Sequence, residues 1–316
     1  MGDSSYPLVR RNEKNPILTP KDWPYPVNSV FNPGAVLLPD GTTLLLCRVE
    51  DRRGISHLCV ARSKNGVDNW EIDPIPTFSP DPVNHPEEVW GIEDPRITWI
   101  EELGRYAICY TAYSRAGPAV ALALTRDFKE FERLGVVMPP ADKDAALLPR
   151  RFNGYWLMIH RPTTWLGAHI YISQSPDLIH WGRHQLVLEA RQGAWWDACR
   201  VGLALPPIET PKGWLIFYHG VKETPSGSIY RVGLALLDLK EPWRCARRGS
   251  EWIFGPTMDY ERVGDVPAVV FPCGGVLERD GETIRIYYGA ADTVICLAWA
   301  RLSELLNWLE NYGSEE

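Results

Sequence analysis

A pattern that recurs five times along the 316 residues restricts the fold more than any other feature of the chain. Each copy holds an apolar segment that ends in polar residues and follows a turn and another apolar stretch. Turns such as PDG and RDG suit tight hairpins, because glycine adopts positive φ without strain. The five segments are LLLCRVED (44–51), AICYTAYS (107–114), LMIHRPTT (157–164), LIFYHGVK (215–222) and RIYYGAAD (285–292). Each copy is therefore expected to begin as a pair of antiparallel strands.

A third apolar strand and a polar turn follow each pair and end on an aromatic residue. These aromatic residues are Trp70, Phe131, Trp181, Trp243 and Trp308. Together with a fourth strand, the repeat predicts an all-β fold, a five-bladed β-propeller that forms one domain over residues 1–316. The 27 prolines and 26 glycines agree with many short strands, since both residue types interrupt long helices. A β-sandwich remains the alternative fold.

The end of the chain has a different character. The segment LSELLNWLENYG places Leu305, Leu306 and Leu309 on one helical face. We predict a short C-terminal helix near residues 303–311, with Ser303 as its N-cap, packed on the last repeat.

The charge and composition of the chain disfavour several classes of partner. A formal net charge of -7 argues against nucleic acid, since phosphate backbones call for a basic face. No apolar stretch approaches the roughly 18 residues of a membrane helix, and the N-terminus lacks the apolar core of a signal peptide. The seven cysteines form no CxxC pair, so we expect small buried hydrophobic residues rather than metal ligands. These features predict a cytoplasmic protein and leave open whether it forms a homo-oligomer.

Polar residues stand at the ends of the apolar strands, where a propeller would bring them to one axis. The innermost strand of every blade lines the central channel. Charged groups within apolar strands are costly unless each is paired or meets a ligand. The residues concerned are Asn32, Arg48, Asp51, Glu93, Asp94, Arg96, Asp144, Arg150, Arg151, His160, Arg161, Arg200, His219, Asp265 and Asp292. Each alone could have an ordinary structural role, such as an Asp that caps a turn before Pro, but together they predict a binding site.

Six motifs in chain order resemble the inverting β-mannoside phosphorylases of glycoside hydrolase family 130. They are VFNPGAV (30–36), GIEDPRIT (91–98), LLPRRFNGYWLMIHRP (147–162), PPIETPKGWLIFYHGV (206–221), GDVPAVVFPCGGV (264–276) and IYYGAADTVICLA (286–298). The resemblance implies a five-bladed propeller in which inorganic phosphate cleaves a β-mannoside into α-mannose 1-phosphate and a shortened sugar. It also implies that no metal or organic cofactor takes part, so manno-oligosaccharide and phosphate are the expected partners.

The resemblance also implies roles for particular residues. Asp94 of the EDPR motif is the expected general acid. The expected phosphate-binding residues are Arg150, Arg161, Arg200 and His219, and the expected sugar contacts are Asn32, Arg48, Asp51 and Asp292. Arg200 stands where many relatives are expected to have lysine, and arginine keeps the charge while offering two parallel hydrogen bonds.

Two of these choices stay open. Adjacent side chains in a strand point to opposite faces, so only one of Glu93 and Asp94 should reach the channel centre. Glu93 is then expected to bind the leaving-group sugar or to pair with Arg96, and it is the second choice for the acid. The same alternation lets only one of Arg150 and Arg151 face the channel, and the motif favours Arg150.

The residue types fit phosphorolysis better than hydrolysis. An inverting hydrolase needs a second carboxylate that activates water. Phosphate is already a nucleophile and instead needs fixed cations that hold it in line with the anomeric carbon. One acid with several Arg and His groups therefore predicts a phosphorylase. A β-mannoside hydrolase and a propeller that binds carbohydrate without catalysis are the alternatives.

Overall fold

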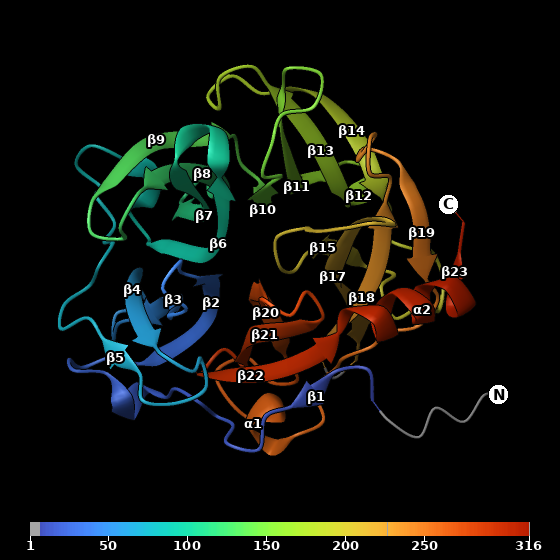
Figure 1. Ribbon diagram of the computed structural model, residues 1–316. Helices are drawn as coiled ribbons and strands as arrows, with labels where there is room; N and C mark the ends of the chain where they lie inside the picture. Colours follow the sequence, from blue (N-terminus) through green and yellow to red (C-terminus); the bar gives the residue numbers. More distant parts are fainter. Residues whose placement is uncertain (1–6, 226, 316) are drawn as a thin grey trace.

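The computed structural model describes residues 7–225 and 227–315, and nearly all regular structure in them is β-strand (Figure 1). The strands form antiparallel sheets around a common centre, with β2, β6, β10, β15 and β20 nearest to it. The all-β class predicted from the repeats is confirmed.

Three sheets have four strands each, and we name each sheet after its strand nearest the centre. The β2 sheet contains β2 (Ser29–Leu37), β3 (Thr43–Glu50), β4 (Ser56–Ser63) and β5 (Glu71–Ile72). The β6 sheet contains β6 (Ile92–Ile100), β7 (Arg105–Ser114), β8 (Gly117–Thr125) and β9 (Phe131–Met138). The β20 sheet contains β20 (Val270–Leu277), β21 (Thr283–Ala290), β22 (Val294–Arg301) and the N-terminal β1 (Arg10–Arg11).

The remaining strands form one larger sheet with two antiparallel groups. The β10 group contains β10 (Asp142–Leu147), β11 (Trp156–Thr164), β13 (Ile170–Ser175) and β14 (Gly182–Leu188). The β15 group contains β15 (Arg200–Leu203), β16 (Ile208–Thr210), β17 (Gly213–Thr224), β18 (Gly227–Leu237), β19 (Cys245–Gly249) and β23 (Gly313–Ser314). The short strand β12 (Gly167–Ala168) joins the groups, because it pairs with β11 and, at Ala168 opposite Arg200, with β15. The apolar segments of the five repeats lie in β3, β7, β11, β17 and β21, so the predicted hairpin pairs are confirmed.

The helices are short. They are the 3-10 helices η1 (Pro20–Asp22), η2 (Pro86–Glu88) and η3 (Glu101–Leu103) and the α-helices α1 (Asp259–Arg262) and α2 (Leu302–Tyr312). Helix α2 confirms the predicted C-terminal helix and buries Leu305 and Leu309. The prediction of Ser303 as the N-cap is wrong. The helix begins one residue before Ser303, so this residue lies in the first turn and its hydroxyl donates to Glu282.

The hydrophobic core lies between neighbouring sheets. Leu44 and Leu58 of the β2 sheet pack with Ile97 and Ile108 of the β6 sheet. The aromatic residues of the repeats take part as well, since Trp70 and Tyr287 of the next sheet meet edge to face with ring centroids 6.2 Å apart. The core is therefore built from the apolar faces that neighbouring sheets turn toward each other.

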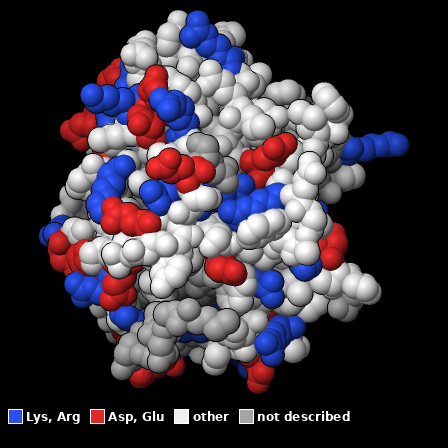
Figure 2. All heavy atoms as spheres, turned by 90° about the vertical axis from the view of Figure 1, so that its right-hand side faces the viewer, with Lys and Arg blue, Asp and Glu red and all other residues white. Residues whose placement is uncertain are grey.

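The surface mixes charges of both signs. Figure 2 shows Lys and Arg side chains next to Asp and Glu side chains over one face of the molecule. None of the described helices is long and apolar enough to cross a membrane. Five of the seven cysteines are buried as predicted, and Cys245 is partly buried. Cys199 departs from the prediction, because it is exposed just before β15.

Candidate active site

Four of the strands nearest the centre carry a break in register near their first residues, and the break in β20 encloses Cys273. The other three breaks lie in β2, β6 and β10, each opposite the strand that follows it in the sheet. Inside each of these three breaks stands a polar residue with positive φ: Asn32 (42°), Asp94 (51°) and Asp144 (57°). Asn and Asp adopt this conformation more readily than other residues with a Cβ atom, and a bulge changes the direction of a side chain. These three bulges thus bring one polar side chain from each strand toward the centre.

Asp94, the predicted general acid, is buried, with 2% of its surface exposed. Its Oδ1 accepts hydrogen bonds from Asn32 Nδ2 at 2.9 Å and from Arg48 at 3.0 Å. Its Oδ2 lies 3.6 Å from Lys143 Nζ. Burial alone would raise the pKa of Asp94, but the charges of Arg48 and Lys143 and the Asn32 bond lower it to about 2. Asp94 is therefore a carboxylate in the free protein.

Glu93 lies beside Asp94 rather than on the far side of the strand. Arg48 donates to Glu93 Oε1 at 2.9 Å and also to Ser56 Oγ at 2.9 Å, while its guanidinium covers the Phe31 ring at 4.4 Å. The prediction that Glu93 and Asp94 point to opposite faces is wrong, because the bulge interrupts the alternation. We call Asn32, Arg48, Glu93 and Asp94 the acid cluster.

Arg96 is not the partner of Glu93. Its Nε and a terminal nitrogen donate to the carbonyl oxygens of Ala204 at 2.6 Å and Leu203 at 2.7 Å. A terminal nitrogen also lies 3.6 Å from Asp144 Oδ1. Arg96 is thus a buried link between the β6 sheet and the β15 group.

A second cluster surrounds Asp144, which the structure buries completely. Arg161 Nε donates to Asp144 Oδ2 at 2.8 Å, and His219 Nε2 lies 3.5 Å from the same oxygen. Burial would raise the pKa of Asp144, but Arg161 and the other nearby basic groups hold it well below its usual range. Burial lowers the pKa of His219 to about 3. The imidazole of His219 is therefore neutral near pH 7 and does not carry the positive charge that the sequence suggested.

Lys143 joins the two clusters, although it was not among the predicted residues. The charges of both Asp94 and Asp144 act on its ammonium group, which lies 3.6 Å from Asp94 Oδ2. In the backbone ladder of β10 and β11, Lys143 is opposite Arg161. Burial would lower the pKa of Lys143, but Asp94 and Asp144 raise it, so the ammonium group stays charged. A lysine between two acids in the segment DKD was the signal that could have found it. We call Lys143, Asp144, Arg161 and His219 the basic cluster.

Arg150 does not belong to this cluster, so its predicted place in the phosphate site is wrong. It follows the end of β10, whereas Lys143 lies near the start of that strand and Arg161 lies opposite Lys143 in β11. Its side chain donates to Glu209 at 2.6 Å and covers the Phe152 ring at 4.7 Å. Arg151 lies in the same turn and donates to Glu102 at 2.9 Å. Neither arginine faces the centre, because the chain reverses direction between β10 and β11 at this point.

Arg200 lies next to the basic cluster but is more exposed. It is the first residue of β15. Gly202, two positions further along the same strand, pairs with His219 of β17. One terminal nitrogen donates to the Tyr230 hydroxyl at 3.0 Å and lies 3.7 Å from Glu223 Oε1. The Tyr230 ring in turn lies 6.0 Å from the His219 ring. Tyr230 therefore connects Arg200 to the neighbourhood of the basic cluster.

The two remaining predicted sugar contacts differ in position. Asp292 has φ of 50° and follows β21, and burial raises its pKa to about 6 while the positive charge of Arg48 opposes the shift. Asp292 therefore lies close enough to the acid cluster for the charges of Arg48 and Asp94 to affect its pKa. Asp51 instead holds a turn together, since its carboxylate accepts from the backbone nitrogens of Arg53 at 2.8 Å and Ile55 at 3.1 Å. It faces an open cavity of about 690 Å³ that Tyr25 and His57 also line, among other residues.

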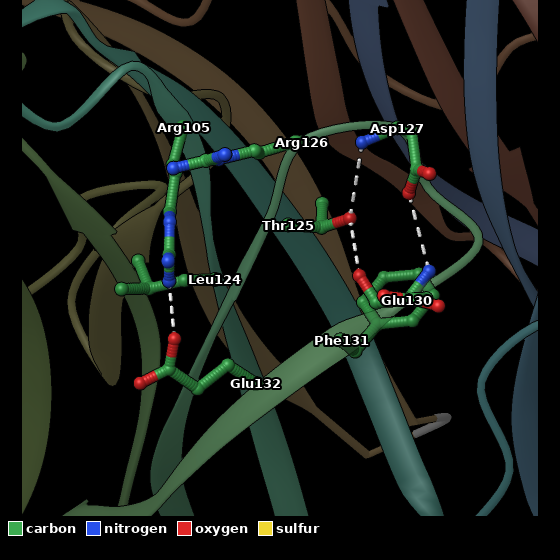
Figure 3. Close-up of a pocket in the computed structure, with 8 residues that line it drawn as sticks. All are labelled: Arg105, Leu124, Thr125, Arg126, Asp127, Glu130, Phe131 and Glu132. Carbon is green, nitrogen blue, oxygen red and sulfur yellow. Dashed lines mark hydrogen bonds and ion pairs between the residues drawn. The ribbon is translucent and has the colours of Figure 1, made fainter.

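Another hollow of the surface lies away from the clusters. Figure 3 shows this pocket in the β6 sheet, where Thr125 donates to the Glu130 carbonyl and Arg105 pairs with Glu132. Arg105 is opposite Ile100 at the end of β6, whereas Glu93 is near its start. The polar groups of this pocket already hold a turn and a strand pair, so it is not the candidate site.

The acid and basic clusters together have the composition expected of a mannoside phosphorylase. The family model described as beta-1,4-mannooligosaccharide phosphorylase matches residues 5–311. The chain belongs to glycoside hydrolase family 130. Within GH130, the beta-1,4-mannooligosaccharide phosphorylase of Ruminococcus albus is 34% identical over 317 residues, which cover 97% of this chain and 92% of the relative.

Solved structures of similar proteins agree with this assignment. The beta-1,2-mannobiose phosphorylase from Listeria innocua, in complex with beta-1,2-mannobiose, has a TM-score of 0.86 and 32% identity, covering 96% of this chain and 99% of that one. Another structure has a TM-score of 0.81 and 26% identity over 95% of both chains. Its description states that the GH130 family of mannoside phosphorylases contains glycoside hydrolases that target beta-1,2 mannosidic linkages in Candida mannan.

Proposed function

We propose that this GH130 protein is an inverting phosphorylase that cleaves β-1,2- or β-1,4-linked manno-oligosaccharides with inorganic phosphate and releases α-mannose 1-phosphate. The observation that carries the proposal is the position of one buried carboxylate, Asp94. Its Oδ2 lies 3.6 Å from the Nζ of Lys143, which belongs to the basic cluster. The names of the relatives support both linkages, since they include mannooligosaccharide and mannobiose phosphorylases. The proposed reaction takes place in the cytoplasm and needs no cofactor beyond phosphate as co-substrate.

The acid cluster would bind the terminal mannose and protonate the leaving oxygen. Asp94 is ionised in the free protein, so it must gain a proton in the complex before it can act as the acid. Phosphate bound at Lys143 would offset the ammonium charge that helps to hold the pKa of Asp94 low. Binding of the nucleophile would then raise the pKa of the acid, which couples the two events.

The basic cluster would hold phosphate on the face of the sugar opposite to the leaving group. Lys143 and Arg161 supply fixed charge, and Asp144 keeps Arg161 in place through its Nε at 2.8 Å. Arg200 would add a third charge, and His219 a neutral hydrogen-bonding group. Inversion follows from attack in line with the departing oxygen, and no base is needed, because phosphate is already an anion.

The proposed fold around this site is a five-bladed propeller. Its support is the arrangement of five antiparallel groups around one centre, with the strands nearest the centre carrying the site residues. The two groups of the larger sheet would be separate blades that the short strand β12 connects. A propeller accounts for the equivalent bulges in β2, β6 and β10, because equivalent positions of successive blades meet at the axis.

The direct experiment measures release of mannose 1-phosphate from β-1,2- and β-1,4-mannobiose with and without phosphate. Cleavage that depends on phosphate supports the proposal. Equal release of free mannose without phosphate would favour the hydrolase alternative. In that case Asp292 is the first candidate for the base, because its pKa of about 6 suits proton abstraction from water.

A further inference from the structure

A chain of hydrogen bonds crosses all four strands of the β10 group. His160 Nδ1 lies 2.6 Å from Asp142 Oδ2, and His160 Nε2 lies 2.7 Å from Ser173 Oγ. The same Ser173 hydroxyl lies 2.6 Å from His184 Nδ1. The four residues come from β10, β11, β13 and β14, so the chain runs from the strand nearest the centre to the outer strand.

The hydrogen bonds of this chain can all be donated in one direction, from His184 toward Asp142. The Asp142 carboxylate only accepts, so His160 Nδ1 carries the proton that joins them. With a neutral ring, His160 Nε2 then accepts from the Ser173 hydroxyl, whose oxygen accepts in turn from His184 Nδ1. Asp142, His160 and Ser173 are exposed by 4%, 2% and 0% of their surface, and only His184 reaches solvent. Loss of any inner member would leave a buried polar group without its partner.

The inner end of the chain adjoins the basic cluster. Asp142 precedes Lys143, and His160 precedes Arg161, and these two cations pair across the same two strands. Since successive side chains point to opposite faces, Asp142 and His160 fill one face of the ladder while Lys143 and Arg161 occupy the other. The bulge that turns Asp144 lies in the next step of this ladder, opposite His160.

We infer that Asp142, His160 and Ser173 are positioning residues for phosphate binding. Their hydrogen bonds fix the spacing of the two strands at the point where Lys143 and Arg161 project, and so the separation of two charges that must grip one anion. The inference rests on the proposed function, because it names the group that the cluster binds. None of the three residues contacts the ligand in this account.

The test uses His160→Phe and Ser173→Ala, with Ser175→Ala as the matched control. Ser175 is a second fully buried serine of β13, but its hydroxyl holds the turn at Asp177 and Leu178 instead. An unsatisfied buried group costs about 1–3 kcal/mol, so the KM for phosphate should rise roughly 5- to 100-fold in the first two variants. The KM for mannobiose and the kcat at saturating phosphate should change less than about 2-fold, as they should in Ser175→Ala.

A readout independent of turnover is the calorimetric titration of each variant with inorganic phosphate alone. Weaker binding in His160→Phe and Ser173→Ala, with wild-type binding in Ser175→Ala, supports the inference. Lower thermal stability with an unchanged KM and Kd for phosphate would overturn it, because the network would then only stabilise the fold. If His160→Phe does not fold, the pair of serine variants decides. If the wild-type protein cleaves mannobiose equally well without phosphate, the proposed function itself is refuted. This outcome is measured on the wild type alone and does not depend on the variants.

Discussion

Asp94 combines two properties that seldom occur together, near-complete burial and a depressed pKa. Burial favours the neutral acid, but Arg48 and Lys143 stabilise the carboxylate more strongly. The residue is thus ionised in the free protein, and in the proposed reaction it would take up a proton only when the charge around it changes. Lys143 is the neighbour whose charge the arrival of phosphate would offset.

Replacing Asp94 by Asn tests its role as the acid. Asn keeps the size and the contact with Arg48 through its oxygen, so the fold should be retained. Turnover of mannobiose should fall about 10²- to 10⁴-fold, the usual contribution of general acid catalysis. Aryl mannosides with activated leaving groups should lose less, because their departing oxygen needs less protonation. Near-normal activity on mannobiose would move the acid to Glu93, which Arg48 holds in the same cluster.

The neutral state of His219 predicts how stability depends on pH. The pKa of this group is about 3 in the folded protein and near 6.5 when unperturbed. Between these values the unfolded chain binds a proton that the folded protein does not, so the free energy of unfolding falls as the pH decreases. One such group contributes a slope of about 1.4 kcal/mol per pH unit.

Urea unfolding of His219→Asn between pH 6 and pH 4.5 should therefore show a shallower slope than the wild type. His57, with a pKa lowered to about 4 by burial, adds to the slope in both proteins. An equal slope in His219→Asn and wild type would mean that His219 is charged in the folded protein.

At the scale of elements, the bulges in β2, β6 and β10 decide which side chains meet. The alternation of side chains along a strand is readable in the sequence, and it gave the hairpins and the apolar faces correctly. An extra residue in one strand reverses that alternation without any clear mark in the sequence. For this reason Glu93 was expected on the wrong face. Lys143 was missed because none of the six motifs includes it, although its two acidic neighbours mark it in the segment DKD.

Arg150 shows a second reason why the sequence alone did not predict the whole site. A motif matches residues along the chain but does not show where a strand ends and the chain turns. Arg150 and Arg161 both belong to one motif, yet they lie at opposite ends of the β10–β11 hairpin. By contrast, Asn32, Arg48 and Asp94 were expected at one site and do lie in contact. Asn32 and Asp94 stand in strands nearest the centre, and Arg48 stands in β3, which pairs with β2.

This difference predicts opposite results for two cationic residues of the same hairpin. Lys143→Ala should raise the KM for phosphate roughly 10- to 100-fold, the effect of losing a charge-assisted hydrogen bond. Arg150→Ala should leave that constant unchanged, because its side chain pairs with Glu209 at the far end. Steady-state kinetics with phosphate varied at saturating mannobiose separates the two. A large effect of Arg150→Ala together with a small effect of Lys143→Ala would restore the motif-based assignment.

At the scale of the whole molecule, a strand from near the N-terminus completes the β20 sheet, whose other strands come from late in the chain. Strand β1 adds to β22, so residues 10 and 11 complete a sheet made otherwise of residues 270–301. Arg11 secures the strand by donating to Glu261 at 2.7 Å, and Tyr288 donates to the same carboxylate at 2.8 Å. Burial acts against the charge of Arg11, but Glu261 raises its pKa, so the pair stays ionised. This contact fastens β1 to the β20 sheet through helix α1.

Arg11→Ala should consequently destabilise the fold far more than Arg10→Ala. Breaking a buried ion pair costs about 3–5 kcal/mol, and the partial exposure of Arg11 reduces the expected loss to about 2 kcal/mol. Arg10 of the same strand pairs with Glu304 at 3.3 Å near the surface, so its loss should cost less than about 1 kcal/mol. Thermal unfolding measures both. Equal losses would show that the pairing of β1, rather than the ion pair, holds this strand in the sheet.

The central claim concerns the nucleophile, and proton and phosphorus NMR of a single reaction tests it most directly. β-1,2- and β-1,4-mannobiose are incubated with the protein in phosphate buffer and, in matched samples, in buffer without phosphate. The account predicts that the first-formed product from at least one of the two sugars is mannose 1-phosphate with the α configuration, and that cleavage stops without phosphate. Free mannose formed at the same rate in both buffers would contradict it.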